Sequence, residues 1–263
     1  MPHVDTAELF DEHGRCLPGR TSAPAHARSR RYFRCNMPTI DDGEIHRRIR
    51  RHLAPSLRIR EDEFCDRVEH LRAGLRDDPA TRNLLAGPVL PFALPQLQVE
   101  DIGESFDARF LPALDAAYRA ALTDYEFVDH SLGGTAGKLS VRPGSRHQSL
   151  LAALARGEVV GLYMPCLSEY SLPAAVERLA ALPERFLLSG AFDTAAALIG
   201  TPDLLLREDG YPPLLWISGV AGEKPGVDYH FEAYGYNLTF NRRAHLDQAA
   251  EYWWHGLTIL AAD

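Results

Sequence analysis

The six residues from Arg142 to His147 are of types that could bind and protonate a small anion. Arg142 ends a predicted strand, and the next residues form a turn in which Ser145 begins a helix. Free backbone N–H groups at a helix start attract carboxylates and phosphates, and two arginines add positive charge. His147 has an unperturbed pKa of about 6.5 and could transfer a proton. We predict that Arg142, Ser145 and Arg146 bind an anion and that His147 is catalytic. The alternative is a helix cap with solvated arginines.

A second segment, Ser189-Gly-Ala-Phe-Asp-Thr194, follows an apolar strand and precedes an apolar helical stretch. It resembles the SGGxDS loop of the ATP pyrophosphatases, with Ala191 in place of the second glycine. The resemblance implies a backbone cradle for pyrophosphate at a helix N-terminus. Ser189 is therefore a candidate ligand-binding residue and Asp193 a candidate catalytic residue. The alternative is a strand-to-helix turn in which Asp193 is the N-cap.

The alternation of a predicted strand places Asp228, His230 and Glu232 on one face. An imidazole and a carboxylate at this spacing can bind one divalent metal, so His230 and Glu232 are candidate metal ligands. The third ligand stays open between three histidines, His130, His245 and His255. A solvated strand face is the alternative. Arg242, beyond the next turn, could pair with these acids or bind a ligand.

Two further segments are similar to known motifs only in part. Gly133-Gly-Thr-Ala-Gly-Lys138 has Leu132 where a P-loop needs its first glycine and Leu139 after the lysine, so a glycine-rich turn explains it better. Cys166 follows a strand and could be a nucleophile, but a buried or merely exposed thiol is the favoured interpretation.

The elements that must position these residues change in character along the chain. Apolar residues at helical spacing predict helices over 41–53 and 61–76, a short helix over 79–85, and a helix over 100–122 bent by Pro112. Three prolines in Pro88–Pro95 exclude a regular helix or an inner strand and predict a junction. Later strands are predicted over Tyr125–Asp129, Lys138–Arg142, Val159–Met164, Arg185–Leu188, Leu204–Arg207, Leu214–Ser218, Tyr229–Tyr234 and Asn237–Asn241. Helices are predicted over Ser145–Ala155, Ser171–Leu182, Thr194–Ile199 and Leu246–Leu260.

This pattern predicts an α+β (mixed α/β) fold, with a helical N-terminal segment followed by a mixed, largely antiparallel sheet packed with helices. We expect an arginine-rich, poorly ordered arm over 1–38, a helical segment with a Pro-rich junction over 39–95, and a mixed α/β core domain over 96–263.

The charges limit the classes of partner. The chain has 26 Arg and 2 Lys and a net charge of −8, with +1 on residues 1–80 and −9 on the remainder. An acidic bulk argues against a general nucleic-acid or anionic-membrane binder. No apolar run is long enough for a membrane span, no secretory signal is visible, and the four cysteines form no CxxC pair. We therefore expect a cytoplasmic protein with reduced thiols.

Three functions remain open. The favoured hypothesis is binding of a small anionic molecule, a carboxylate or a phosphate, with catalysis on it left open. The first alternative is a homo-oligomer or protein partner that docks through residues 1–95, where Arg30, Arg31, Tyr32 and Phe33 could grip an acidic surface. The second is a non-haem metal enzyme that uses His230 and Glu232. No motif specifies a cofactor.

Overall fold

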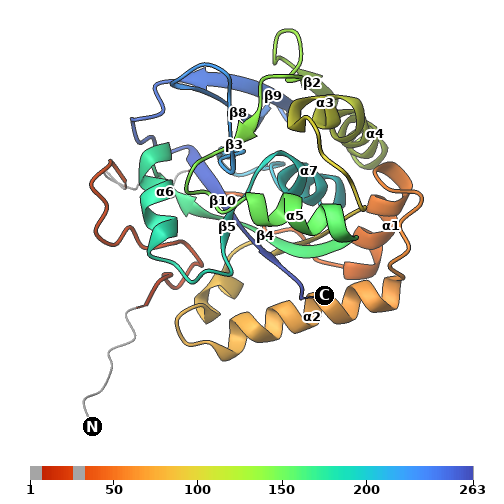
Figure 1. Ribbon diagram of the computed structural model, residues 1–263, viewed down its shortest axis with the longest axis horizontal. Coiled ribbons are helices and arrows are strands. Elements are labelled where there is room, and N and C mark those ends of the chain that lie inside the picture. The colour runs from red at the N-terminus through yellow and green to blue at the C-terminus, as the bar shows by residue number, and fades with distance from the viewer. Residues whose placement is uncertain (1–7, 26–32, 263) are drawn as a thin grey trace.

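A mixed sheet of eight strands forms the centre of the computed structural model, which describes residues 8–25 and 33–262 (Figure 1). The strand order is β1-β4-β10-β6-β8-β9-β2, and β5 pairs with β10 off this path. The β10–β6 and β2–β9 pairs are parallel and the other pairs are antiparallel. The strands are β1 (Leu90–Leu94), β2 (Phe127–Asp129), β4 (Val159–Ser168), β5 (Leu187–Leu188), β6 (Leu214–Trp216), β8 (Val227–Tyr234), β9 (Asn237–Ala244) and β10 (Trp253–Leu260). A separate two-stranded sheet pairs β3 (Ser140–Val141) with β7 (Val220–Ala221).

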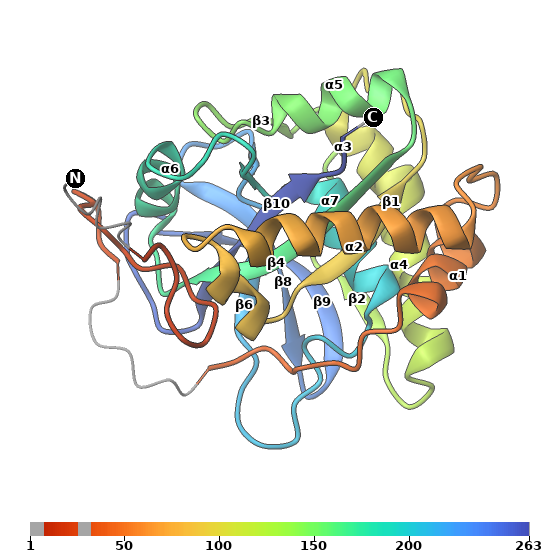
Figure 2. The same cartoon turned by 90° about the horizontal axis from the view of Figure 1, so that it is seen from below.

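Helices cover both faces of this sheet. They are α1 (Asp42–His52), α2 (Glu61–Asp77), α3 (Ile102–Ser105), α4 (Leu111–Ala121), α5 (Gln148–Arg156), α6 (Leu172–Ala180) and α7 (Ala191–Gly200), with a 3₁₀ turn over Arg82–Ala86. Figure 1 shows α7 on one side of β4 and α2 on the other, and Figure 2 shows α2 lying across β1 and β4. With about 33% helix and 23% strand, the structure confirms the predicted α+β class.

The predicted helix over 100–122 forms as three consecutive pieces. Asp101 caps α3 by accepting a hydrogen bond from the Glu104 amide at 2.9 Å. A π-helical turn over Phe106–Phe110 then precedes α4, in which Pro112 occupies the first turn. Because proline donates no backbone hydrogen bond, the first turn of a helix is the position that tolerates it. The sequence predicted a bend at Pro112. The structure instead changes helix type just before this proline, from the π-helical turn to α4.

Three sequence predictions are wrong in element type. The helix predicted over Leu246–Leu260 is a turn followed by β10, because Trp253–Ile259 is buried on both faces at the centre of the sheet. A short apolar run buried on both faces has no periodicity that separates strand from helix. Pro88–Pro95 contains β1 where a junction was predicted, but the predicted exclusion of a regular helix or an inner strand is confirmed, because β1 pairs only with β4 and is an edge strand that tolerates Pro91. Residues 204–207 form the end of a turn and an irregular segment rather than a strand.

One main hydrophobic core spans all three predicted regions of the chain. It contains Phe10 from the expected arm, Ile45 from the expected helical segment, and Ile259 from the expected core domain. Phe10 is fully buried, so the described part of 1–38 packs on the core. Four arm residues, Arg28, Arg30, Arg31 and Tyr32, lie outside the described residues. Within 8–25 and 33–262, no helix is long and apolar enough to cross a membrane.

Candidate functional site

The predicted anion-binding arginines make extensive contacts within the fold. The Arg142 guanidinium donates to the carbonyls of Ser218 at 2.9 Å and Val220 at 2.8 Å, and to Asp228 Oδ2 at 2.5 Å. Burial raises the pKa of Asp228, and Arg142 offsets part of that rise. Arg142 therefore ties the turn before α5 to β7 and β8, and its ligand-binding role stays a prediction.

Arg146 and Ser145 also act on the backbone. Arg146 has a positive φ of 58°, and its guanidinium donates to the carbonyls of Leu182, Pro183 and Phe186 at 2.8–3.3 Å. Ser145 Oγ donates at 2.7 Å to the Arg142 carbonyl. The Arg146 guanidinium therefore holds the loop after α6 in place and is not the solvated side chain of the alternative interpretation. The N-cap of α5 is His147 rather than Ser145, and it makes no side-chain capping hydrogen bond.

The structure brings three other predicted residues, His147, Ser189 and Asp193, into one buried cluster. Asp193 Oδ1 accepts from the Gly190 amide at 2.8 Å, and Oδ2 accepts from Thr258 Oγ1 at 2.6 Å. Ser189 Oγ lies 2.8 Å from Thr258 Oγ1, and His147 Nδ1 lies 3.2 Å from the Leu188 carbonyl. Burial lowers the pKa of His147, although the Asp193 charge opposes this. No side chain of the predicted trio is more than 1% exposed, so a substrate does not reach them in this structure.

This cluster also explains the pyrophosphatase-like segment. Gly190 is the N-cap of α7, and Asp193, predicted as the N-cap, is the third helical residue, which reaches back to the Gly190 amide. The amide that would bind a phosphate is thus occupied by the chain's own carboxylate. A carboxylate of the chain also takes the place of a phosphate in the P-loop-like turn. There the Thr135 and Ala136 amides donate to Asp107 Oδ2 at 2.5 and 3.0 Å. The glycine-rich turn interpretation of that segment fits these contacts.

The candidate metal ligands lie together without a third ligand. His230 Nε2 is 3.6 Å from Glu232 Oε1, which accepts from Asn241 Nδ2 at 2.7 Å. Strand alternation places His230 and Glu232 on one face, as predicted, and Arg242, opposite Tyr229, on the other. In the part of the chain that the structure describes, no group of three or more His, Cys, Asp or Glu could hold a metal ion. The metal hypothesis stays a prediction that lacks a third ligand.

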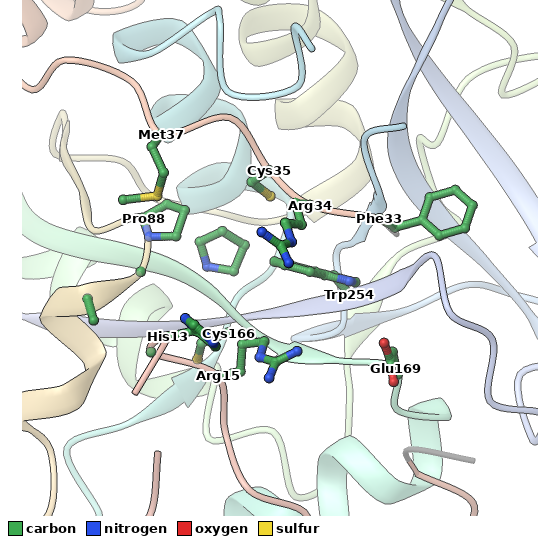
Figure 3. A pocket seen from close by; sticks show the side chains of 14 residues that line it. His13, Arg15, Phe33, Arg34, Cys35, Met37, Pro88, Cys166, Glu169 and Trp254 are labelled. Carbon is green, nitrogen blue, oxygen red and sulfur yellow. The ribbon is translucent and has the colours of Figure 1, made fainter. Parts of the chain in front are cut away.

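A cavity of about 160 Å³ lies elsewhere, between the N-terminal segments and the central strands (Figure 3). Its walls come from residues 13–15, 33–37 and 86–88 and from residues of β4, β10 and the position that follows β4. These wall segments are far apart in the sequence. Figure 3 shows the Trp254 side chain in the middle of the cavity, with Arg34 above it and Arg15 below it.

The charged side of the cavity carries both signs of charge. Arg15 Nη2 lies 2.6 Å from Asp11 Oδ2, and the other oxygen of Asp11 accepts the amides of His13 and Arg15 at 2.9 Å. Burial alone would raise the pKa of Asp11, but the hydrogen bonds from Arg15 and the amides outweigh it and lower the pKa. Glu169 follows β4 with a positive φ of 66°, and only 6% of this residue is exposed. Arg15, Arg34 and Glu169 thus frame one side of the cavity.

Trp254 adds a hydrogen-bond donor to this wall. The residue is 6% exposed, and its Nε1 has no hydrogen-bond partner within the described ranges. A buried N–H without a partner costs about 1–3 kcal/mol, so native proteins pair nearly all of them with protein, water or ligand. Trp216 and Trp253 also have buried indole N–H groups without a partner among the described residues, and Trp254 is the one of the three that lines this cavity.

Part of the cavity lining is apolar. Met37 and Pro88 lie together at the upper left of Figure 3, whereas Cys35 lies beside Arg34 and Cys166 lies beside His13 and Arg15; Pro165 also lines the cavity. Burial raises the pKa of both thiols well above its usual range, so they stay protonated near neutral pH. Protonated thiols are poor nucleophiles, which agrees with the buried-thiol interpretation of Cys166.

Sequence reasoning missed this site, although several of its residues had been considered for other roles. Phe33 and Arg34 belong to the expected arginine-rich arm, Pro88 to the predicted junction, and Cys166 was considered as a nucleophile. Nothing in their spacing brings them together, because five separate segments build the cavity. Comparisons of the chain with protein-family models, with curated proteins and with solved structures found no match.

Proposed function

We propose that this protein binds a small organic anion in the cavity around Trp254. The observation that carries the proposal concerns Trp254, which lines a cavity with two arginines and whose buried N–H has no acceptor among the described residues. A carboxylate would accept hydrogen bonds from the indole and from a guanidinium, while the rest of the ligand would pack on the apolar part of the lining. The proposal keeps the predicted class of ligand but places it away from Arg142 and Arg146.

The proposal concerns binding rather than turnover. The two thiols that line the cavity are protonated, so they do not supply a nucleophile. All four cysteines are free thiols, which supports a reducing compartment, and we retain the cytoplasm as the proposed location.

The test uses calorimetric titration of the full chain with 4-methylpentanoate, a small carboxylate with a branched apolar part. Trp254→Phe keeps an aromatic ring and removes the N–H, so it should weaken binding about tenfold. Trp253→Phe is the matched control, because Trp253 is equally buried but packs in the second, smaller apolar cluster with Trp216. It should leave the affinity unchanged. Equal losses in both variants, or no binding of any small carboxylate by the wild-type chain, would contradict the proposal.

A further inference from the structure

We infer that the ligand of the cavity is a small monocarboxylate and that Arg15 is the residue that binds its carboxylate. This assignment rests on the proposed function, and it names the chemical class of the ligand and the group that recognises it. It follows from the free edge of the Arg15 guanidinium, the firm attachment of the turn that carries Arg15, the balance of charge in the lining, and the volume of the cavity.

The Arg15 guanidinium is only partly used within the chain. Its Nε and Nη2 donate to Asp11 Oδ2 at 2.9 and 2.6 Å, so Asp11 takes the side edge of the guanidinium. A guanidinium has five N–H groups, and the end edge between Nη1 and Nη2 has no partner in the part of the chain that the structure describes. A planar carboxylate accepts two parallel hydrogen bonds from such an edge. Arg15 therefore brings to the lining a pair of donors that match a carboxylate.

Trp254 contributes a donor as well. Its buried Nε1–H has no acceptor among the described residues, and Figure 3 shows Arg15 below the indole. Because the unpaired groups of Trp254 and Arg15 are donors, the ligand must supply acceptors. An ionised carboxylate only accepts hydrogen bonds, whereas an amide or an amine adds further donors.

The turn that carries Arg15 is held in place by the chain itself. Asp11 Oδ1 accepts the amides of His13 and Arg15 at 2.9 Å, and the Asp11 amide donates to the Arg15 carbonyl at 2.9 Å. Gly14 packs so closely on the neighbouring segment that a Cβ there would lie 2.6 Å from the Gly87 amide nitrogen. A binding group that is ordered in advance loses less entropy when the ligand binds.

The balance of charge favours a ligand with a single negative charge. The described lining contains Arg15, Arg34 and Glu169, and Asp11 pairs with Arg15. Two positive charges are therefore matched by two negative charges. A dianion such as a phosphonate would find no excess of positive charge to offset its second charge, whereas a carboxylate adds only one.

The volume limits the whole ligand. A dry apolar cavity of about 150 Å³ accommodates one benzene ring. The present cavity of about 160 Å³ therefore fits a complete ligand of about that size, including its carboxylate. A short branched acid such as 4-methylpentanoate meets this limit, and its apolar end would pack on Met37 and Pro88.

The first experiment compares three ligands with the same branched chain by calorimetric titration of the full-length protein. 4-Methylpentanoate carries a carboxylate, 4-methylpentanamide carries a neutral amide, and 3-methylbutylphosphonate carries a tetrahedral group of higher charge. The carboxylate should bind at least about tenfold more tightly than the amide or the phosphonate. This comparison needs no variant.

The second experiment measures the same preference in variants. Arg15→Gln should lower the affinity for 4-methylpentanoate about tenfold and that for 4-methylpentanamide by less than about threefold, because only the carboxylate accepts from both N–H groups of the end edge. A loss of structure would instead weaken both ligands. Arg119→Gln is the matched control, since Arg119 also pairs with an aspartate at i,i+4 spacing but lies outside the cavity lining. It should leave both affinities unchanged.

The outcomes separate the two proposals. If the wild-type chain does not bind 4-methylpentanoate, or binds the amide equally well, both proposals are wrong. If the phosphonate binds as tightly as the carboxylate, or Arg15→Gln keeps the full preference for the carboxylate, the assignment is wrong and the proposed anion binding stands. Should Arg15→Gln fail to fold, Arg15→Lys keeps the positive charge but lacks the end edge, and it should lose most of the preference as well.

Discussion

Burial lowers the pKa of three buried histidines, His147, His230 and His255, and it brings the pKa of His255 to about 4. His255 Nδ1 lies 2.5 Å from Ser218 Oγ and its Nε2 lies 2.9 Å from the Tyr170 carbonyl. A neutral imidazole satisfies both contacts, by accepting at Nδ1 and donating at Nε2, whereas a protonated ring would present two donors.

The lowered pKa of His255 predicts a loss of stability in acid. The unfolded chain binds a proton at His255 below about pH 6.5, whereas the folded chain resists until about pH 4, so stability falls between these values. His255 should contribute roughly 3 kcal/mol to this loss. Urea unfolding between pH 4 and 7.5 should therefore show a shallower pH dependence for His255→Gln than for wild type. His70→Gln, at an exposed histidine, should keep the wild-type dependence. An unchanged slope in His255→Gln would refute this assignment.

For single residues, the sequence indicated which polar side chains make important hydrogen bonds, but it did not indicate the partners of those hydrogen bonds. The turn Arg142–His147 was predicted to bind an anion, yet its guanidinium groups donate mainly to backbone carbonyls. A guanidinium requires acceptors whether these belong to a ligand or to the chain, so residue type does not distinguish the cases. Glu169 and Trp254 were not predicted as site residues because their roles depend on burial, which distant segments create.

Elements with a clear amphipathic pattern were predictable, whereas of two central strands buried on both faces, β4 was predicted as a strand and β10 as a helix. Helix α2 formed where its apolar spacing placed it, and the alternation of β8 gave the correct shared face. Strand β10 has no such pattern, because its neighbours β4 and β6 enclose it in the sheet and the core covers its faces. Its position at the centre of the sheet depends on pairing with residues 86 or more positions away in β4, which local sequence does not encode.

The glycine in β10 provides a test of how closely this strand is packed. A Cβ at Gly256 would lie 2.4 Å from Tyr163 Cε2 and 2.6 Å from Ser189 Oγ. Gly256→Ala should therefore destabilise the protein by about 1–3 kcal/mol through overpacking. Gly74→Ala in α2, where nothing lies within 4 Å of the added atom, should stabilise it by about 0.5–1 kcal/mol. Chemical denaturation of both variants measures the difference, and a tolerated alanine at Gly256 would show that β10 is less tightly packed than described.

At the scale of the whole molecule, residues 10–16 contribute both to the hydrophobic core and to the cavity wall, although their composition is that of a loop. Small and polar residues with interspersed prolines predicted an arm, but Phe10 and Cys16 form a β-bridge and both are buried. The Cys16 amide donates to the Cys166 carbonyl at 2.8 Å, and Asn83 Nδ2 donates to the Phe10 carbonyl at 3.0 Å. Burial of Phe10 and Cys16 is enough to hold residues 10–16 against the core, although the average composition of this segment is that of a loop. The turn between them supplies His13 and Arg15 to the cavity, so the core and the candidate site depend on the same segment.

This dependence predicts that Phe10→Ala affects both folding and binding. Phe10 is fully buried, with its ring centroid 6.2 Å from that of Phe186, and its truncation should cost about 3–5 kcal/mol. Because one core spans the chain, unfolding followed by tryptophan fluorescence and by far-UV circular dichroism should shift together to lower denaturant concentration. The affinity for 4-methylpentanoate should fall as well, since the turn carrying Arg15 loses its anchor. Leu17→Ala, at a residue 38% exposed, should change neither quantity appreciably. Unchanged stability in Phe10→Ala would mean that the N-terminal segment is an appendage in solution and that the cavity wall it forms is not permanent.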